Sequence, residues 1–364
     1  MNYKRIIPVL IICLAMIPSM AVGQKAIETR TLEKSFPVTE GMSLEVTNKY
    51  GKVHLSKTFA DSVNIRIEMH ASAPNQSKLR KLVDGVTFEL NSTNYFIIAE
   101  TRFLKGRANI FEGIRNITNN LISSESKVEI NYYVMVPDFI DIKIDNRYGD
   151  IYVESTSCDL DIKMSNGNFK AEDLSGNNFF DLSFFDATIN SCERARMNLS
   201  YGELKISEAS DLNIVSSSSR IEIDNINNLR LDSKRDKYYI RDIDKIEGEG
   251  YFTEFEIEKI GTSAGLNTKY GSLRIINLEP GFSILSIDSD YTTIDISTLK
   301  GSSFNVDIKA VNCPVNLPGE WQLEEKTISE ERKEYLYFGR TNIKESGSQV
   351  KINCERGNLL FYEK

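Results

Sequence analysis

Apolar and polar residues alternate along most of this chain, in short runs separated by a recurring turn. Alternation puts every second side chain on the same side of the backbone, which is typical of a β-strand with one buried face. The turn is a repeated phrase in which an aromatic residue or an asparagine precedes glycine. Its copies are Asn48-Lys-Tyr50-Gly51, Asn146-Arg-Tyr148-Gly149, Asn166-Gly167, Tyr201-Gly202 and Tyr270-Gly271, with a last, reduced copy at Gly357.

The turns recur about every 18 residues between positions 149 and 292. A strand with one apolar face cannot bury that face alone, so we expect the chain to wind and stack equivalent strands in parallel, about 4.8 Å apart. A propeller needs about 40 residues per blade, and leucine-rich repeats need a different apolar frame. A left-handed hexapeptide helix also has 18-residue coils, but its six-residue apolar beat is absent. The pattern therefore predicts an all-β fold, a single-stranded parallel β-helix (β-solenoid) that is right-handed.

We interpret the turn phrases as structural. Glycine can adopt positive φ at a corner, and Asn48, Asn146 and Asn198 can cap the neighbouring backbone or stack in a ladder. The phrases imply no catalytic, cofactor-binding or metal-binding role.

Two excursions interrupt the rhythm. The first contains strand patterns at 63–69 and 85–103 and a helix at 76–84, a small α+β insertion expected to cover the open first coil. Apolar residues at helical spacing in 104–124 predict a packed lid, with a membrane-binding or partner-binding helix as the alternative. The second excursion contains Trp321. The predicted divisions are a signal peptide (1–23), first strands and first coil (24–60), an inserted cap or side module (61–127), β-solenoid coils (128–309), the second excursion (310–348) and a returning C-terminal coil (349–364).

The first residues have the pattern of an export signal. Lys4 and Arg5 precede an apolar run at 6–17, and small residues at 21–23 precede Gln24. The run is too short to span a membrane, and no second apolar stretch of about 18 residues follows it. We therefore expect an exported protein of the periplasm, the outer-membrane surface or the extracellular space. The net charge of −8 disfavours nucleic acid, because phosphate binding requires clustered Lys and Arg.

Four cysteines follow the predicted signal, and their spacing resembles neither a disulfide framework nor a zinc site. Buried free thiols are the expectation for Cys158 and Cys192, which stacking would hold two coils, about 9.6 Å, apart. Cys313 and Cys354 flank the second excursion, and the pattern leaves open whether they are bonded.

Candidate chemistry is sparse. Gly261-Thr-Ser263-Ala-Gly265 matches a nucleophile-elbow string but lies between predicted strands, and the two histidines, His54 and His70, are far away in the sequence. Carboxylates that could pair across coils leave a carbohydrate-active lyase or hydrolase as the alternative function; they are Asp145, Asp150, Asp159, Asp161, Asp181 and Asp186. Aromatic residues are candidates for a sugar-stacking platform, although alternation places about half of them in the core; they are Tyr132, Tyr133, Tyr238, Tyr239, Phe179, Phe180, Phe184 and Phe185.

The stretch Val128-Glu-Ile-Asn-Tyr-Tyr-Val-Met-Val-Pro137, followed by the phrases at Tyr148-Gly149 and Asn166-Gly167, resembles the bacterial "putative adhesin" family of exported β-solenoid domains. That family is a domain of unknown function, similar to the autotransporter-adhesin head GIN domain. The resemblance covers about residues 38 to 308 and implies a non-enzymatic envelope protein, without catalytic residues or cofactors.

These observations together predict an adhesin-like protein that presents a surface to an envelope glycan or protein. Besides the carbohydrate-active enzyme, an envelope stress or scaffold accessory protein is the other alternative. The sequence does not identify the partner or the oligomeric state.

Overall fold

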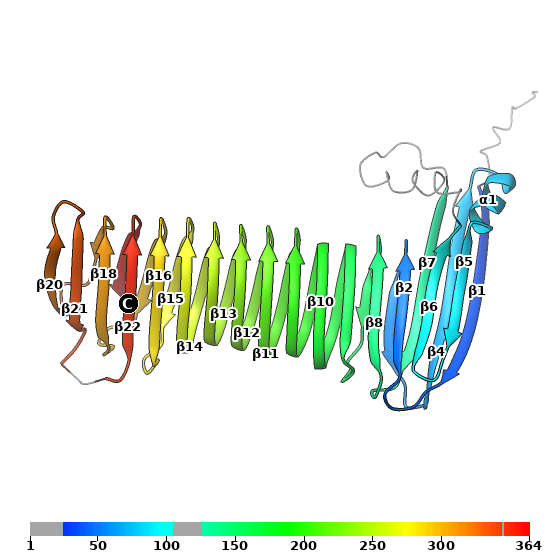
Figure 1. Ribbon diagram of the computed structural model, residues 1–364, viewed down its shortest axis with the longest axis horizontal. Coiled ribbons are helices and arrows are strands. Elements are labelled where there is room, and N and C mark those ends of the chain that lie inside the picture. Colours follow the sequence, from blue (N-terminus) through cyan, green and yellow to red (C-terminus); the bar gives the residue numbers. More distant parts are fainter. Residues whose placement is uncertain (1–24, 105–125, 344–345) are drawn as a thin grey trace, which may run out of the picture.

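The computed structural model describes residues 25–104, 126–343 and 346–364, which form one sheet of 23 strands and one short helix. The predicted all-β class is confirmed. The molecule is elongated, and its strands lie side by side along a single long axis (Figure 1).

The N-terminal elements are β1 (Ala26–Pro37), β2 (Ser43–Lys49), β3 (Val53–Lys57), β4 (Ser62–Ala73), α1 (Gln76–Val83), β5 (Val86–Ser92), β6 (Phe96–Phe103) and β7 (Lys127–Val136). The central strands are β8 (Asp141–Arg147), β9 (Ile151–Val153), β10 (Leu160–Ser200), β11 (Glu203–Ser217), β12 (Arg220–Lys234), β13 (Lys237–Tyr251), β14 (Glu254–Lys269), β15 (Ser272–Leu278), β16 (Ile284–Asp290) and β17 (Thr293–Thr298). The C-terminal strands are β18 (Asn305–Val311), β19 (Val315–Asn316), β20 (Gln322–Ser329), β21 (Glu334–Arg340), β22 (Gln349–Glu355) and β23 (Asn358–Glu363).

The central strands pair in parallel with chain one repeat further on. Leu160 lies opposite Ile142, 18 residues away, whereas Arg220 lies opposite Glu203 and Lys237 opposite Arg220, 17 residues away. Each repeat contributes a segment to each of two rows. Row A runs through β3, β9, the first halves of β11 to β14, β15 and β17; row B runs through β2, β8, the second halves of β11 to β14 and β16. The long strand β10 contributes to both rows.

Both ends of the stack depart from chain order. Strand β2 pairs in parallel with β8 on one side and with β6 on the other, so the outer β6 comes later in the sequence than β2. At the opposite end β22 pairs in parallel with both β16 and β18, and the C-terminal segment is thereby inserted into the stack (Figure 1). Each end therefore holds one strand between partners that are distant in sequence.

The N-terminal end is closed by antiparallel strands and the helix. Strand β4 pairs antiparallel with β7 and β1, and β5 pairs antiparallel with β6. Helix α1 begins after Asn75, whose side chain accepts a hydrogen bond from the backbone N–H of Lys78. Its Leu79, Leu82 and Val83 are buried. The predicted lid at 104–124 falls, except for its first residue, outside the described residues.

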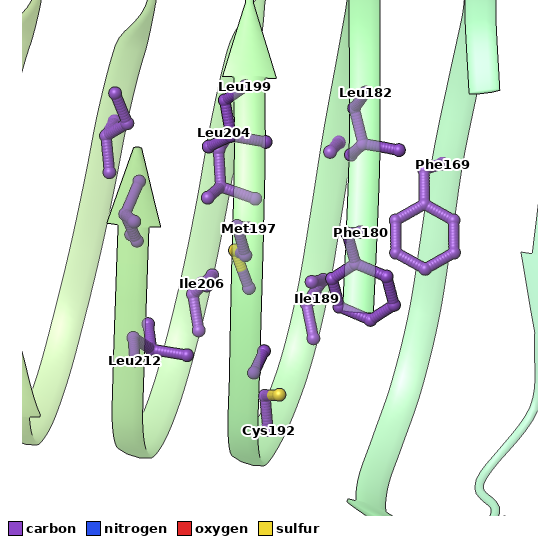
Figure 2. Packing of buried hydrophobic residues seen from close by; sticks show 14 of the residues in the cluster. Phe169, Phe180, Leu182, Ile189, Cys192, Met197, Leu199, Leu204, Ile206 and Leu212 are labelled. Atoms are coloured by element: carbon purple, nitrogen blue, oxygen red, sulfur yellow. The ribbon is translucent and has the colours of Figure 1, made fainter. Parts of the chain in front are cut away.

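The core is one continuous column of apolar side chains between the two rows. Alternation produces it: along row B of β10 and β11, Met197, Leu199 and Leu212 point inward, and along row A, Ile189 and Ile206 do the same (Figure 2). Every repeat adds a layer to this column, so burial of apolar area accumulates along the axis. In the part of the chain that the structure describes, no helix is long and apolar enough to cross a membrane.

Candidate binding surface

The chain passes from row B to row A through a tight corner at which one residue adopts a left-handed conformation. These corner residues are Tyr50, Tyr148, Asn166, Phe184, Tyr201, Ser218, Arg235, Phe252, Tyr270, Tyr291 and Arg356, with φ between 50° and 66°. A bulky non-glycine residue in this region is uncommon, because its Cβ crowds the backbone. The recurring corner is therefore a strained position that the chain fills mostly with aromatic residues.

The predicted role of glycine in the turn phrase was wrong. The left-handed residue is the one before glycine, and Gly51, Gly149, Gly167, Gly202, Gly271 and Gly357 do not have positive φ. A Cβ at Gly149 would overlap the carbonyl oxygen of Gly51, and one at Gly167 would overlap that of Gly149. Glycine is required because successive coils approach each other closely at this point.

Two of the three predicted asparagine caps are present. Asn146 is fully buried, and its Nδ2 donates to the carbonyl oxygens of Gly51 and Asp150, both at 3.0 Å. Asn48 is buried and donates to the carbonyl oxygen of Ile130 at 3.0 Å. Asn198 stands three residues before its corner tyrosine rather than two, so its side chain points to solvent and the prediction for it was wrong.

The corner aromatics stack on one another along the axis. Phe184 and Tyr201 have ring centroids 5.2 Å apart and planes 8° apart. Tyr270 lies between Phe252 and Tyr291, at 5.1 Å from each. At the N-terminal end Tyr50 and Tyr148 form a third stack, at 5.6 Å. We call these three groups the corner stacks.

Two of the corner stacks are open to solvent. The five rings of the second and third repeats of the motif are 41–58% exposed, in contrast to Tyr50, which is 8% exposed; they are Phe184, Tyr201, Phe252, Tyr270 and Tyr291. Ser218 and Arg235 occupy the two corners between Tyr201 and Phe252, so the rows of rings stop there. The guanidinium of Arg356 lies 4.6 Å from the centroid of Tyr291 and ends the row at the other side.

A buried carboxylate was missed by sequence reasoning. Asp236 follows the corner residue Arg235 and is 1% exposed. Its carboxylate accepts hydrogen bonds from the hydroxyls of Ser216 and Ser233, at 2.8 and 2.7 Å, and from the backbone N–H of Ser219 at 2.7 Å. These donors come from three successive coils, and a buried charge held in this way is a structural brace. Its signal was an acid in place of the turn glycine.

The other sequence candidates do not converge on a site. Ser263 lies within strand β14, not at a strand-to-helix turn, and His70 contacts Thr29 at the N-terminal end. Asp159 accepts a hydrogen bond from Asn177, and Asp181 pairs with Lys163 at 3.6 Å. Within the described residues no group of three or more His, Cys, Asp or Glu could hold a metal ion.

The predicted aromatic platform is divided between core and surface. Tyr132, Tyr238, Phe180 and Phe185 are buried, whereas Phe184 and Tyr133 are exposed. Burial raises the pKa of the Tyr132 and Tyr238 hydroxyls, which bond to Thr101 and Ser216. The exposed aromatic surface lies instead at the corner, where the 17- to 18-residue spacing of Phe184, Phe252 and Tyr291 was a usable signal.

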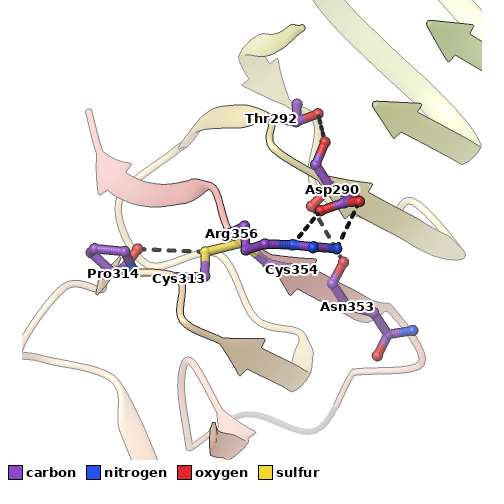
Figure 3. The surroundings of a disulfide bond; sticks show 8 residues. Asp290, Thr292, Cys313, Pro314, Asn353, Cys354 and Arg356 are labelled. Atoms are coloured by element: carbon purple, nitrogen blue, oxygen red, sulfur yellow. Dashed lines mark hydrogen bonds and ion pairs between the residues drawn. A yellow bond between two sulfur atoms is a disulfide. The ribbon is translucent and has the colours of Figure 1, made fainter. Parts of the chain in front are cut away.

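Cys313 and Cys354 form a disulfide, with Cα atoms 6.2 Å apart (Figure 3). This settles the alternative that the sequence left open. Cys158 and Cys192 are free and buried, as expected. Burial raises the pKa of both thiols, that of Cys192 to about 12.

Comparisons with known proteins give distant structural likeness only. A "putative cell adhesion protein" from Clostridium sporogenes is 11% identical, with 93% of this chain and 100% of that chain covered, at a TM-score of 0.21. A "putative adhesin" from Bacteroides fragilis is 13% identical (73% and 97% covered, TM-score 0.32), and a "putative lipid binding protein" from Parabacteroides distasonis is 9% identical (74% and 97% covered, TM-score 0.33). No family model and no curated protein matches the chain. At these TM-scores the likeness identifies neither a family nor a ligand.

Proposed function

We propose that this chain is a non-enzymatic, exported protein of the bacterial envelope, in which a right-handed β-solenoid presents an adhesin-like surface to a glycan or protein partner. The corner stacks carry the proposal. They place half-exposed aromatic rings in a straight row at the spacing of the coils, on a rigid framework. Aromatic side chains of this kind supply large contact areas at low entropic cost.

Backbone strain at the corner strengthens this interpretation. A left-handed tyrosine or phenylalanine is less favourable than the asparagine that the chain uses at Asn166, which has the same conformation. Stacking between coils offsets part of that strain, but stacking alone does not require the rings to remain half exposed. Binding to a partner would give the exposed edges a use.

Export has separate support. The predicted signal at 1–23 lies outside the described residues apart from the chain that follows it, but the Cys313–Cys354 disulfide is typical of an oxidising compartment. Periplasm, outer-membrane surface and extracellular space are all compatible with it.

The test is a panel of glycans and envelope polysaccharides applied to the purified mature chain, read for binding and for release of reducing or unsaturated ends. The doubly substituted variant Tyr201→Asn, Phe252→Asn removes the two rings that face the gap at Ser218 and Arg235. The matched control is Tyr95→Asn, which removes an aromatic that is 75% exposed in the β5–β6 turn. We expect binding without turnover, weakened by the double variant and not by the control. Turnover of any polysaccharide would overturn the proposal in favour of the enzyme.

A further inference from the structure

A shallow groove of about 700 Å³ lies on row B across β10 to β13, away from the corner stacks. It has an apolar floor at Ala195, Leu212 and Leu229, where side chains turn inward and leave the backbone exposed. Two columns of polar side chains border this floor, each column built from residues in register on successive coils. The groove is therefore parallel to the long axis and open at the surface.

The first column reads Asn177, Arg194, Asp211, Asn228 and Lys245. The second reads Phe179, Arg196, Asn213, Arg230 and Glu247. Four cations thus line the groove against two acids, in a chain whose net charge is −8. The local balance is the reverse of that of the whole molecule.

Existing contacts leave part of this positive charge available. Arg230 pairs with Glu247 at 3.6 Å, and Asp211 accepts a hydrogen bond from Asn228 at 2.8 Å, so both acids are already engaged. Arg194 donates to Asn177 at 3.1 Å. Among the described residues, no hydrogen bond or ion pair engages the side chains of Arg196 and Lys245, and both are exposed.

The spacing suits a repeating charged ligand. Arg196 and Arg230 are in register two coils apart, which separates their backbones by about 10 Å along the axis. Acids close the groove at both ends: Asp159 and Asp161 precede Asn177 and Phe179 in the two columns, and Glu249 follows Glu247. A linear anion would therefore occupy about four coil steps, about 20 Å.

We infer that this groove binds a linear polysaccharide that carries carboxylates, with Arg196 and Lys245 holding its charges and the half-buried Phe179 stacking on a sugar ring at one end. The inference rests on the proposed binding function and names the ligand class for a second surface of the same molecule. Arginine forks match carboxylates, and the amides of Asn213 and Asn228 are suited to sugar hydroxyls. A protein partner would not need cations at coil spacing.

The experiment measures binding of the mature chain to polygalacturonate, to a neutral dextran of similar length and to heparin. The test variant is Arg196→Gln, Lys245→Gln. The matched control, Lys170→Gln, Arg241→Gln, removes the same charge from row A, outside the groove. We expect polygalacturonate to bind better than dextran, to weaken as NaCl increases, and to lose about tenfold in affinity in the test variant but not in the control. A separate variant, Phe179→Ala, should weaken binding at high salt as well as at low salt, because stacking is not screened.

Three results would overturn the inference. Equal loss in the test and control variants would show that only net charge matters, and binding of heparin without polygalacturonate would assign the groove to sulfated polymers. Binding of neutral glycans that depends on Tyr201 and Phe252, with no polygalacturonate binding, would remove the groove site while leaving the proposed function intact. Circular dichroism of each variant checks that the fold is retained.

Discussion

At the scale of single residues, the corner turn divides its demands between two neighbours. The first residue accepts the left-handed conformation, and the second must lack a Cβ because the next coil's carbonyl oxygen occupies that space. Ser219, Asp236, Thr253 and Thr292 replace this glycine in other coils, and there the side chain is buried and makes local hydrogen bonds or packs inside. Glycine is thus specific to the coils whose neighbours approach most closely.

Gly149→Ala tests this close approach. The new methyl group would overlap the carbonyl oxygen of Gly51, so the coils must separate, and we expect a loss of about 3 kcal/mol or more in unfolding free energy. Urea unfolding followed by circular dichroism measures it. Gly319→Ala is the control, because no atom lies within 4 Å of a Cβ there and its φ is not positive. Equal stability of the two variants would show that the coils separate without cost.

Cys192 predicts a dependence of stability on pH. Burial raises the pKa of this thiol to about 12, whereas an unfolded cysteine titrates near 8.5. As pH rises above about 8.5 the unfolded chain loses the proton and the folded chain keeps it, so stability falls, by about 2 kcal/mol at pH 10. Urea unfolding at pH 7 and pH 10 should show this loss in the wild type and a smaller one in Cys192→Ala. Parallel losses in both proteins would assign the effect to other groups.

At the scale of elements, the corner stacks couple one coil to the next. Tyr270 stacks on both Phe252 and Tyr291 and meets the edge of Tyr251, whereas Tyr201 stacks only on Phe184. Each stacked pair contributes about 0.5–1.5 kcal/mol. Coupling between coils should therefore depend on how many neighbours a ring has.

Replacement of corner tyrosines by asparagine isolates this coupling. Asn166 shows that asparagine fits the corner conformation, and asparagine tolerates it better than tyrosine does. We expect Tyr270→Asn to lower the unfolding free energy by about 1–3 kcal/mol and Tyr201→Asn by less than about 1.5 kcal/mol. Thermal and urea unfolding measure both, and a larger loss for Tyr201→Asn would contradict the stacking account.

Alternation and turn spacing were sufficient to predict the strands and their repeat, because both are local properties of the chain. The order of strands at the ends was not accessible in this way: β22 pairs with β16 across 65 residues, and nothing local distinguishes that partner from a sequential one. The role of Gly149 depends on the backbone of another coil and was missed for the same reason. The cations of the groove looked like an ordinary solvent face, although two 17-residue steps from Arg196 lead to Arg230.

At the scale of the whole molecule, the inserted C-terminal segment is held on both sides. Cys354 in β22 is bonded to Cys313, which follows β18, and Arg356 makes ion-paired hydrogen bonds with both carboxylate oxygens of Asp290 in β16, at 3.0 and 2.9 Å (Figure 3). The outermost strand, β20, pairs within the described residues only with β21 and carries charged side chains along its length. Charges on an edge strand disfavour end-to-end pairing of molecules.

A stack in which each coil contacts mainly its neighbours should lose stability locally when one end is loosened. Cys354→Ser removes a cross-link between residues 41 apart in sequence, which is worth about 2–4 kcal/mol. We expect amide hydrogen exchange to accelerate in β18 to β23 and to stay unchanged in β10 to β13, since the central coils keep all their neighbours. Cys158→Ser, at a buried thiol near the other end, is the control and should leave exchange in β18 to β23 at its wild-type rate. Equal acceleration along the whole stack in Cys354→Ser would show that the coils unfold as one cooperative unit, and the C-terminal clamp would then stabilise the entire molecule rather than its end.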